Sequence, residues 1–279
     1  MPCCFERCFV QTSNIAPRSV FDRIVSVMAW LALAFLLFPV LLTAIVSVND
    51  SFFIEFPPKA FSYKWYLNIS NIHAIGKSTL ISVSIALTAA FLCTSLAIAA
   101  SLAISRYDFP GKAFLTAFLL SPITMPMVAV GIALIQFFIM IGSAFTWYSL
   151  LIGHMVLVIA YPIRTLLASL TLMNPSLEEA ALSLGATKFK TFWTVTLPQL
   201  KPGLISGFLF AFLISFDNYP ISVFLVRGGL STMPIEIFNY ISQNLDPTPA
   251  AFSTLYVIVV SLIITFAERR YRIVSYSIQ

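Results

Sequence analysis

Six apolar runs dominate this sequence, and each of them is long enough to cross a lipid bilayer. They lie at about 24–48, 79–104, 113–140, 149–171, 204–226 and 251–267. A hydrocarbon core about 30 Å thick takes about 20 helical residues to span, and its lack of water excludes irregular backbone exposed to lipid. Hydrophobic residues make up 59% of the chain and charged residues 10%, a balance that a soluble domain does not sustain. The sequence therefore predicts an all-α, polytopic membrane protein with six transmembrane helices, since a β-barrel would need short alternating segments.

Basic side chains are concentrated in alternate loops between these runs. They precede the first run and follow the second, the fourth and the sixth: Arg7, Arg18, Arg23, Arg106, Lys112, Arg164, Lys188, Lys190, Lys201, Arg269, Arg270 and Arg272. Cytoplasmic loops carry such an excess, so both termini and the loop at about 172–203 are expected in the cytoplasm. This topology accounts for the net charge of +5 without a nucleic-acid partner. We expect a cytoplasmic N-terminal tail, 1–23, and a transmembrane domain, 24–279.

The four cysteines suggest neither a disulfide nor a metal site. Cys3, Cys4 and Cys8 lie in the predicted cytoplasmic tail, and Cys93 lies within the second apolar run. A structural disulfide needs an oxidising compartment, and a structural zinc site needs a fourth ligand that neither the tail nor a neighbouring loop supplies. We therefore expect a free tail without a bound metal.

The polar loop between the fourth and fifth runs is too highly charged to lie in hydrocarbon. It predicts two short helices joined at a glycine. Ser176 and Glu179 have the spacing of a capping box, and Gly185 supplies the left-handed residue that ends the first helix. The second helix is expected from Lys188 to about Val195, ending before Leu197-Pro198. Such a helical pair must face water or another protein.

Small residues, prolines and a histidine set the expected roles of the second, third and fourth runs. The second run is rich in alanine and serine, which favours close packing inside the bundle. Pro122 and Pro126 break the backbone ladder of the third, which is either a broken helix lining a pathway or a helix kinked by packing. His154 in the fourth could act as a proton relay. Without an intramembrane carboxylate nearby in the sequence, we favour a hydrogen-bonded packing role.

Asp217 lies well inside the fifth run and is followed by Asn218, Tyr219 and Pro220. A membrane-embedded carboxylate is costly and normally faces a partner or an aqueous pathway. Pro220 interrupts the helix and frees backbone groups that could face a ligand. We interpret Asp217 as a pathway residue. A structural ion pair with Arg227 or a contact with a neighbouring helix is the alternative.

No catalytic or nucleotide-binding motif accompanies these features. The sequence contains neither a phosphate-cradling glycine loop with its lysine nor a G-x-S-x-G, H-E-x-x-H or paired C-x2-C motif. Glu178 and Glu179 are adjacent, so on a helix they point about 100° apart and do not form an acid–base pair. We expect this chain to have no cofactor and no enzymatic activity.

Part of the polar loop resembles a known family signature. Glu179-Ala180-Ala181 is followed after three residues by Gly185, and after nine more by Val195-x-Leu197-Pro198. This pattern is similar to the EAA loop of membrane subunits of binding-protein-dependent ABC importers, with valine where isoleucine is commonest. The six-span layout extends the resemblance over most of the chain. It implies the MetI-like, type I ABC importer permease fold in a bacterial inner membrane.

The resemblance implies partners as well as a fold. In that family the loop forms coupling helices that bind a cytoplasmic ATP-binding subunit, two membrane subunits form the pathway, and an outer binding protein delivers the solute. By position, the coupling residues would be Glu178, Glu179, Ala180, Ala181, Gly185, Leu197 and Pro198. The expected assembly adds a second permease subunit, two ATP-binding subunits and a periplasmic or extracellular solute-binding protein.

The stretch around Asp217, FDNYPISVFL, resembles the smaller permease of spermidine/putrescine-type importers. The resemblance implies a cationic amine at Asp217 and a gate or cation–π wall at Tyr219, with Asn218 where many relatives have a second acid. It also favours a paralogue as the second permease. Permeases of similar appearance carry aminoethylphosphonate, ferric iron, thiamine, opines or 4-aminobutyrate. The alternative class is an ion-coupled secondary transporter, for which Asp217 and His154 are the candidate coupling residues and no inverted repeat is visible.

Overall fold

The computed structural model describes residues 20–53, 55, 57–58 and 60–271, and that part of the chain is almost entirely helical. Five helices are long and apolar enough to span a membrane, namely Phe21–Ser47, His73–Arg106, Trp147–Leu172, Lys188–Phe216 and Thr248–Arg269. The bent pair Lys112–Ile123 and Met127–Met140 is the sixth when its two helices are counted as one span. The predicted all-α architecture with six spans is thus confirmed. The tail that contains Cys3, Cys4 and Cys8 lies outside the described residues.

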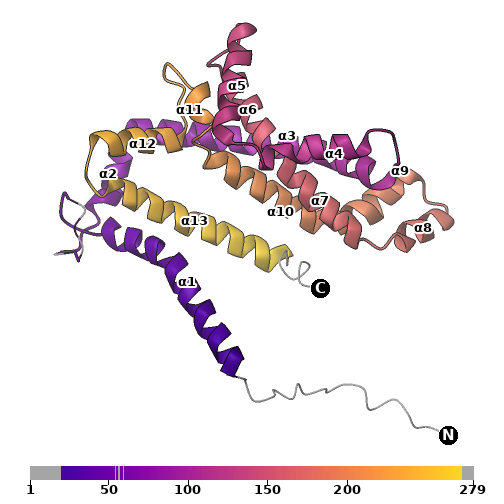
Figure 1. Cartoon of the computed structure of the whole chain (residues 1–279), viewed down its shortest axis with the longest axis horizontal. Coiled ribbons are helices and arrows are strands. Elements are labelled where there is room, and N and C mark those ends of the chain that lie inside the picture. Colours follow the sequence, from indigo (N-terminus) through magenta and orange to yellow (C-terminus); the bar gives the residue numbers. More distant parts are fainter. Residues whose placement is uncertain (1–19, 54, 56, 59, 272–279) are drawn as a thin grey trace.

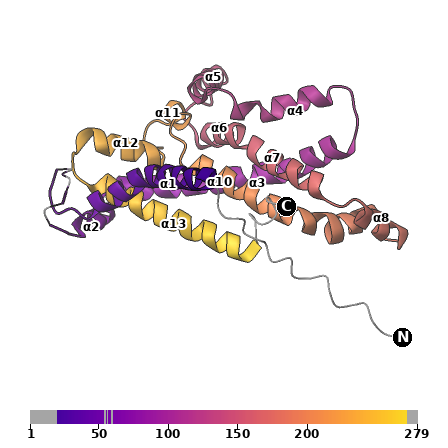
Figure 2. The same cartoon turned by 60° about the horizontal axis from the view of Figure 1, so that its bottom comes forward.

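The helices follow the order of the predicted runs (Figure 1). They are α1 (Val20–Ser47), α2 (Lys64–Asn71), α3 (His73–Arg106), α4 (Lys112–Leu120), α5 (Met127–Met140), α6 (Trp147–Val158), α7 (Ala160–Leu172), α8 (Ser176–Ser183), α9 (Lys188–Thr191), α10 (Leu197–Phe216), α11 (Ser222–Leu225), α12 (Met233–Gln243) and α13 (Thr248–Tyr271). Figures 1 and 2 place α8 and α9 at one end of the long axis and α2 and α12 at the other. The length of the spans therefore separates the polar loop from α2 and α12.

The third span is broken at its two prolines. α4 ends at Leu120, a short 3-10 turn covers Ser121–Ile123, and α5 starts after Pro126, whose backbone is extended. The two halves meet at an angle of 104°. Proline has no N–H to donate and its ring clashes with the preceding turn, so two prolines four residues apart end one helix and begin another. Of the two predicted alternatives, the broken helix is therefore found and the simple kink is wrong.

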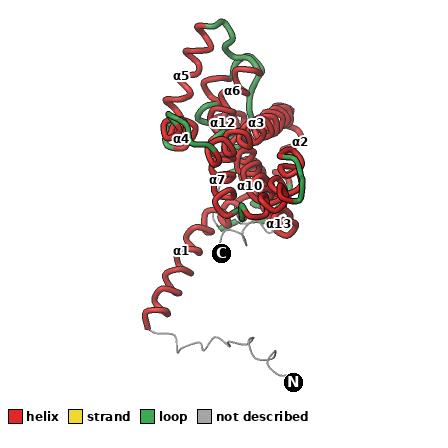
Figure 3. The backbone as a smooth tube through the Cα atoms, turned by 90° about the vertical axis from the view of Figure 1, so that its right-hand side faces the viewer, coloured by secondary structure: helices red, strands yellow, loops and turns green. Residues whose placement is uncertain are grey.

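α1 diverges from the other spans, as Figure 3 shows along the long axis of the molecule. Its contacts within the described chain are mainly with α13. The most apolar 18-residue window of α1 contains no buried residue. A helix that faces hydrocarbon needs no protein cover, because all its backbone groups bond within the helix. This face is therefore left for lipid or for a neighbouring subunit.

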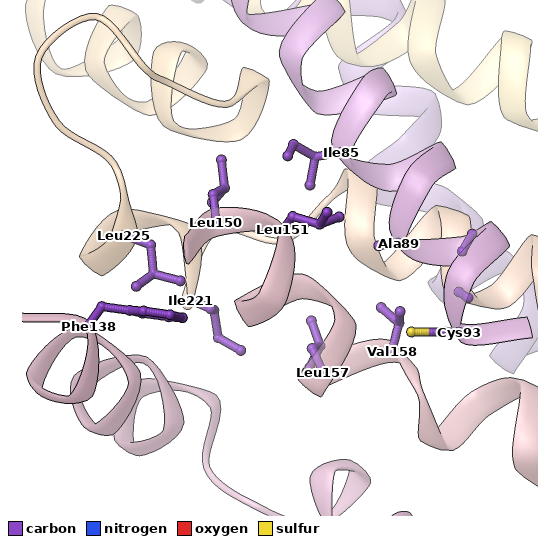
Figure 4. Packing of buried hydrophobic residues seen from close by; sticks show 12 residues of the cluster. Ile85, Ala89, Cys93, Phe138, Leu150, Leu151, Leu157, Val158, Ile221 and Leu225 are labelled. Carbon is purple, nitrogen blue, oxygen red and sulfur yellow. The ribbon is translucent and has the colours of Figure 1, made fainter. Parts of the chain in front are cut away.

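The largest buried cluster joins α3 and α6 to α11 (Figure 4). Its members are Ile85, Ala89, Ala90, Cys93, Phe138, Leu150, Leu151, Leu157, Val158, Ala211, Ile221 and Leu225. The two alanines of α3 in this cluster, Ala89 and Ala90, are completely buried. Small side chains allow neighbouring helices to approach closely in a bilayer, where no hydrophobic force drives them together. The predicted position of the second span inside the bundle is confirmed.

Two glycines of α10 bring this helix against α7. Gly203 offers its carbonyl oxygen to the Thr165 hydroxyl, at 3.0 Å. A Cβ atom added at Gly207 would lie 2.8 Å from the Cα atom of Pro162, closer than carbon atoms approach without overlap. The close packing of α7 against α10 thus depends on the missing side chain of Gly207.

Candidate functional site

The polar loop begins with a cap that differs from the predicted one. Ser176 is the first residue of α8 and makes no capping box with Glu179. Instead the Asn174 side-chain oxygen accepts hydrogen bonds from the Ser176 backbone N–H, at 3.1 Å, and from its hydroxyl, at 2.7 Å. Pro175 has helical backbone angles, so the turn tightens one residue earlier than the capping-box spacing assumes. The predicted capping box is therefore wrong, and asparagine serves in its place.

The other end of α8 is formed as predicted. Gly185 has a φ angle of +85°, the left-handed conformation that favours glycine. The Gly185 N–H donates to the Leu182 carbonyl and the Ala186 N–H donates to the Ala181 carbonyl, at 3.0 and 3.1 Å. These two bonds define a Schellman cap, which satisfies carbonyls that the end of the helix leaves free. The loop thus holds α8 and α9 in a fixed relation.

The second helix of the loop does not end where the sequence analysis placed its end. α9 passes into a π-helical turn, Phe192–Thr196, which continues directly into α10. In that turn the Leu197 N–H bonds to the Phe192 carbonyl, five residues back. The wider turn shifts the hydrogen-bond register just before Pro198, whose missing N–H would otherwise interrupt a regular helix. The predicted stop before Leu197-Pro198 is therefore wrong, and one helical segment of 29 residues runs from Lys188 to Phe216.

The two adjacent glutamates of α8 have different surroundings. Glu178 points inward, with 17% of its side chain exposed, and forms an ion pair with Arg106. Its carboxylate also accepts a hydrogen bond from the Thr196 hydroxyl. Glu179 and Ala180 are exposed, and Ala181 is half-buried. Sequence reasoning counted both Glu178 and Glu179 among the coupling residues and missed the contact of Glu178 with Arg106, because 72 residues separate the two partners.

Large apolar side chains are exposed on this polar loop. Leu184 is 88% exposed and Phe189 is 74% exposed, and Leu177, Leu182 and Trp193 are also among the exposed side chains. They flank the exposed part of the predicted coupling residues, Glu179, Ala180 and Gly185. Exposed apolar groups surrounded by polar ones are typical of a protein-binding surface.

The three predicted pathway residues are neighbours in sequence but face different surroundings. Asp217 follows the last residue of α10 and its side chain is exposed. Asn218 is buried, and its side-chain oxygen accepts a hydrogen bond from the Ile221 N–H at 3.0 Å. The Tyr219 ring packs against Phe238 of α12, with 5.1 Å between ring centroids. Asn218 is therefore a structural residue of the turn, whereas Asp217 and Tyr219 border accessible space.

Asp217 has no ion pair with Arg227 in the described part of the chain. The Arg227 guanidinium instead lies over the Phe145 ring, 5.5 Å from its centroid.

The fifth span ends earlier than the predicted range 204–226. α10 ends at Phe216, and the rest of that run is a turn with Pro220 followed by the short helix α11. The predicted interruption of the helix near Pro220 is confirmed, and the alternative of an Asp217–Arg227 pair is wrong.

His154 holds the two sides of this interruption together. Its ring is buried, with Nδ1 2.7 Å from the Ser215 hydroxyl of α10 and Nε2 3.0 Å from the Ser222 hydroxyl of α11. The Ser222 hydroxyl donates in turn to the Asn218 carbonyl. A buried imidazole with both nitrogens bonded has the packing role that we favoured for it.

The breaks of the third and fifth spans meet each other. The Asn218 amide lies 3.9 Å from the Met127 sulfur at the start of α5. A Cβ atom at Gly131 would lie 2.6 Å from the Phe224 ring and 3.3 Å from the Pro220 carbonyl. Non-helical backbone at membrane depth is tolerated where protein buries it or water reaches it. The two interrupted helices thus adjoin at Asn218, Pro220 and Phe224, in the turn that directly follows Asp217.

Comparison with protein families identifies the class of this protein. The profile of the family described as "Binding-protein-dependent transport system inner membrane component" matches residues 95–274. The chain belongs to this family. It is a multi-pass inner-membrane permease component of an ABC importer, and separate ATP-binding subunits and a solute-binding protein complete such a system. Because the chain belongs to this family, the alternative of an ion-coupled secondary transporter is rejected.

Relatives and solved structures agree with that assignment. The putrescine transport system permease protein PotI of Escherichia coli K12 is 30% identical over 232 residues, 81% of this chain and 82% of the relative. The spermidine/putrescine transport system permease protein PotC of Haemophilus influenzae is 26% identical over 236 residues, 84% of this chain and 91% of the relative.

Two solved structures share the fold. A bacterial ABC transporter involved in the import of the acidic polysaccharide alginate has a TM-score of 0.62 at 16% identity, covering 91% of this chain and 98% of that one. The MetNI methionine ABC transporter has a TM-score of 0.59 at 15% identity, covering 73% of this chain and 97% of that one. Both support the type I ABC importer permease fold.

Proposed function

We propose that this permease imports a polyamine such as putrescine or spermidine, or a related small amine. The exposed carboxylate of Asp217 carries the proposal, because it directly precedes the turn where two broken spans meet, in a chain that resembles PotI and PotC over four-fifths of its length. A carboxylate in a low-dielectric setting attracts a cationic amine strongly. Tyr219 beside it offers an aromatic ring for cation–π contact.

The polar loop supports a second part of the proposal. We place the contact with an ATP-binding subunit at Glu179, Ala180, Ala181 and Gly185, together with the exposed Leu184 and Phe189. The other predicted coupling residues differ from these: Glu178 is largely shielded by its partners, and Leu197 and Pro198 form the start of α10. Two ATP-binding subunits would serve a permease pair, one for each coupling loop.

The permease pair itself is inferred from α1 and from the relatives. The uncovered apolar face of α1 suits a second permease subunit, and a paralogue is our choice because relatives of both the PotI and PotC kinds match this chain. The distribution of lysine and arginine supports a cytoplasmic position for the polar loop and both termini. In this arrangement 1–23 is a cytoplasmic tail and 24–279 is the permease domain.

Uptake of labelled putrescine into proteoliposomes tests the proposed solute. The vesicles would contain the permease pair and ATP-binding subunits, with ATP inside and the binding protein outside. Uptake is expected to need both ATP and binding protein, and to survive collapse of ion gradients. ATP-dependent uptake of another solute, with putrescine and spermidine neither transported nor competing, would overturn the polyamine assignment.

Substitutions at Gly185 test the proposed ATPase contact. Gly185→Val should reduce co-purification of the ATP-binding subunit at least fivefold, because a branched side chain pays about 1–2 kcal/mol for the left-handed conformation and the Schellman cap opens. Nothing lies within 4 Å of a Cβ atom at this position, so the effect comes from the backbone. Gly185→Asn is the matched control, since asparagine tolerates this conformation. Equal co-purification of both variants would contradict the assignment.

A further inference from the structure

The carboxylate of Glu178 joins three helical elements at the polar end of the molecule. Glu178 lies in the first turn of α8. Arg106, its ion-pair partner, is the last residue of α3. Thr196, its hydrogen-bond donor, is the last residue of the π-helical turn that leads into α10. One side chain of the loop therefore contacts both the second and the fifth spans.

The local electrostatics favour this arrangement. A carboxylate in the first turn of a helix lies at the positive end of the helix dipole, and a guanidinium in the last turn lies at the negative end, so both positions are favourable. Thr196 is 1% exposed and the Glu178 side chain is 17% exposed, so the carboxylate is largely shielded from water, whereas 38% of the Arg106 side chain is exposed. Charge-assisted hydrogen bonds in such surroundings are stronger than those between exposed pairs. The shielded carboxylate and its second bond, from Thr196, distinguish this contact from a salt bridge between two exposed side chains.

Without the ion pair, α8 packs mainly against its own loop and has little contact with the rest of the bundle. Its main neighbours are α9 and the π-helical turn, both of which belong to the same polar loop. The ion pair with Arg106 adds a direct connection to α3, a helix whose opposite half lies in the buried core. Movement of α8 would therefore reach α3 through one pair of side chains.

We propose that Glu178 and Arg106 are positioning residues that transmit the movement of α8 to the second and fifth spans. This inference rests on the proposed contact between the polar loop and an ATP-binding subunit. Glu178 then acts after docking, while its neighbour Glu179 belongs to the docking surface. Removing the Glu178 charge should leave the ATP-binding subunit bound but weaken the link between ATP hydrolysis and solute movement.

The test is the amount of solute imported per ATP hydrolysed, measured with the complete importer in proteoliposomes. Glu178→Gln and Arg106→Gln are each expected to lower this ratio at least fivefold, with the ATP-binding subunit still co-purifying. Thr196→Val should have a smaller effect, because it removes one hydrogen bond and no charge. The double variant Arg106→Glu with Glu178→Arg should regain at least half of the lost ratio, because it restores the pair with its charges exchanged.

A merely structural role predicts a different pattern. In that case Glu178→Gln would lower assembly and uptake together, and the ratio of solute to ATP would stay unchanged. An unchanged ratio, or an exchanged pair no better than the single variants, would overturn the inference. If Glu178→Gln does not assemble, Arg106→Gln provides the same test, since it removes the other charge of the pair.

Failure of the underlying function is distinguishable from failure of this inference. Glu179→Arg changes the docking surface and should release the ATP-binding subunit. If Glu179→Arg and Gly185→Val both retain it, the loop is not the docking site. Those two variants could instead lose the subunit while Glu178→Gln keeps a normal ratio of solute imported to ATP hydrolysed. The loop would then be the docking site, but Glu178 would not transmit the movement of α8.

Discussion

Gly207→Ala is expected to destabilise the permease by about 1–3 kcal/mol, the usual cost of overpacking a well-packed interior. The added methyl group would lie 2.5 Å from the Thr165 hydroxyl and 2.8 Å from the Cα atom of Pro162. The hydroxyl can rotate away, but the proline backbone cannot, so α7 and α10 must separate. Because these helices connect the polar loop to the bundle, ATP-dependent uptake should fall as well.

The thermal unfolding midpoint of the purified permease in detergent measures this effect. Gly76→Ala is the matched control: Gly76 also lies in a long helix, α3, and a Cβ atom there meets nothing within 4 Å. Alanine is the better helix former by about 1 kcal/mol, so this control should be as stable as the unchanged protein or more so. Equal unfolding midpoints for Gly207→Ala and Gly76→Ala would contradict this prediction, because α7 and α10 would then separate without loss of stability.

Asp217→Asn is expected to lower uptake of a cationic amine at least tenfold at limiting substrate. The substitution keeps the size of the side chain and removes its charge, and a tenfold change corresponds to about 1.4 kcal/mol. The exposed position at the end of α10 leaves room for this exchange without a packing defect. The amount of assembled importer should therefore stay the same while the substrate concentration for half-maximal uptake rises.

Asp108→Asn is the control for a general effect of losing a carboxylate. The Asp108 side chain is fully exposed and pairs with Lys112 one helical turn away, a surface contact that contributes little. Initial rates of uptake over a range of putrescine concentrations would compare the two variants. Normal kinetics for Asp217→Asn would make Asp217 a structural residue.

The parts of the fold that follow from short stretches of sequence were predictable. Six spans follow from the length of the apolar runs, and the break in the third follows from Pro122 and Pro126. The left-handed Gly185 and the interrupted helix near Pro220 also depend on neighbouring residues alone. In each case the physical cause lies within one continuous stretch of sequence.

The features that were missed depend on distant contacts or on two competing local choices. Glu178 is held by Arg106 from another span, and no spacing rule relates them. Both Asn174 and Ser176 are residue types that cap helices. Because Pro175 already has helical backbone angles, the cap is formed by Asn174. Proline normally interrupts a helix, but the π-helical turn before Pro198 allows the helix that begins at Lys188 to continue into α10. Gly203 and Gly207 are informative only because α7 lies against them.

The uninterrupted helical segment from Lys188 to Phe216 gives the polar loop a long lever arm. At about 1.5 Å per residue, its 29 residues measure about 43 Å from end to end. A tilt of about 10° at the end near Lys188 would displace the end beside Asp217 by about 7 Å, given that length. A span jointed at Leu197-Pro198 would have absorbed the same tilt at its joint.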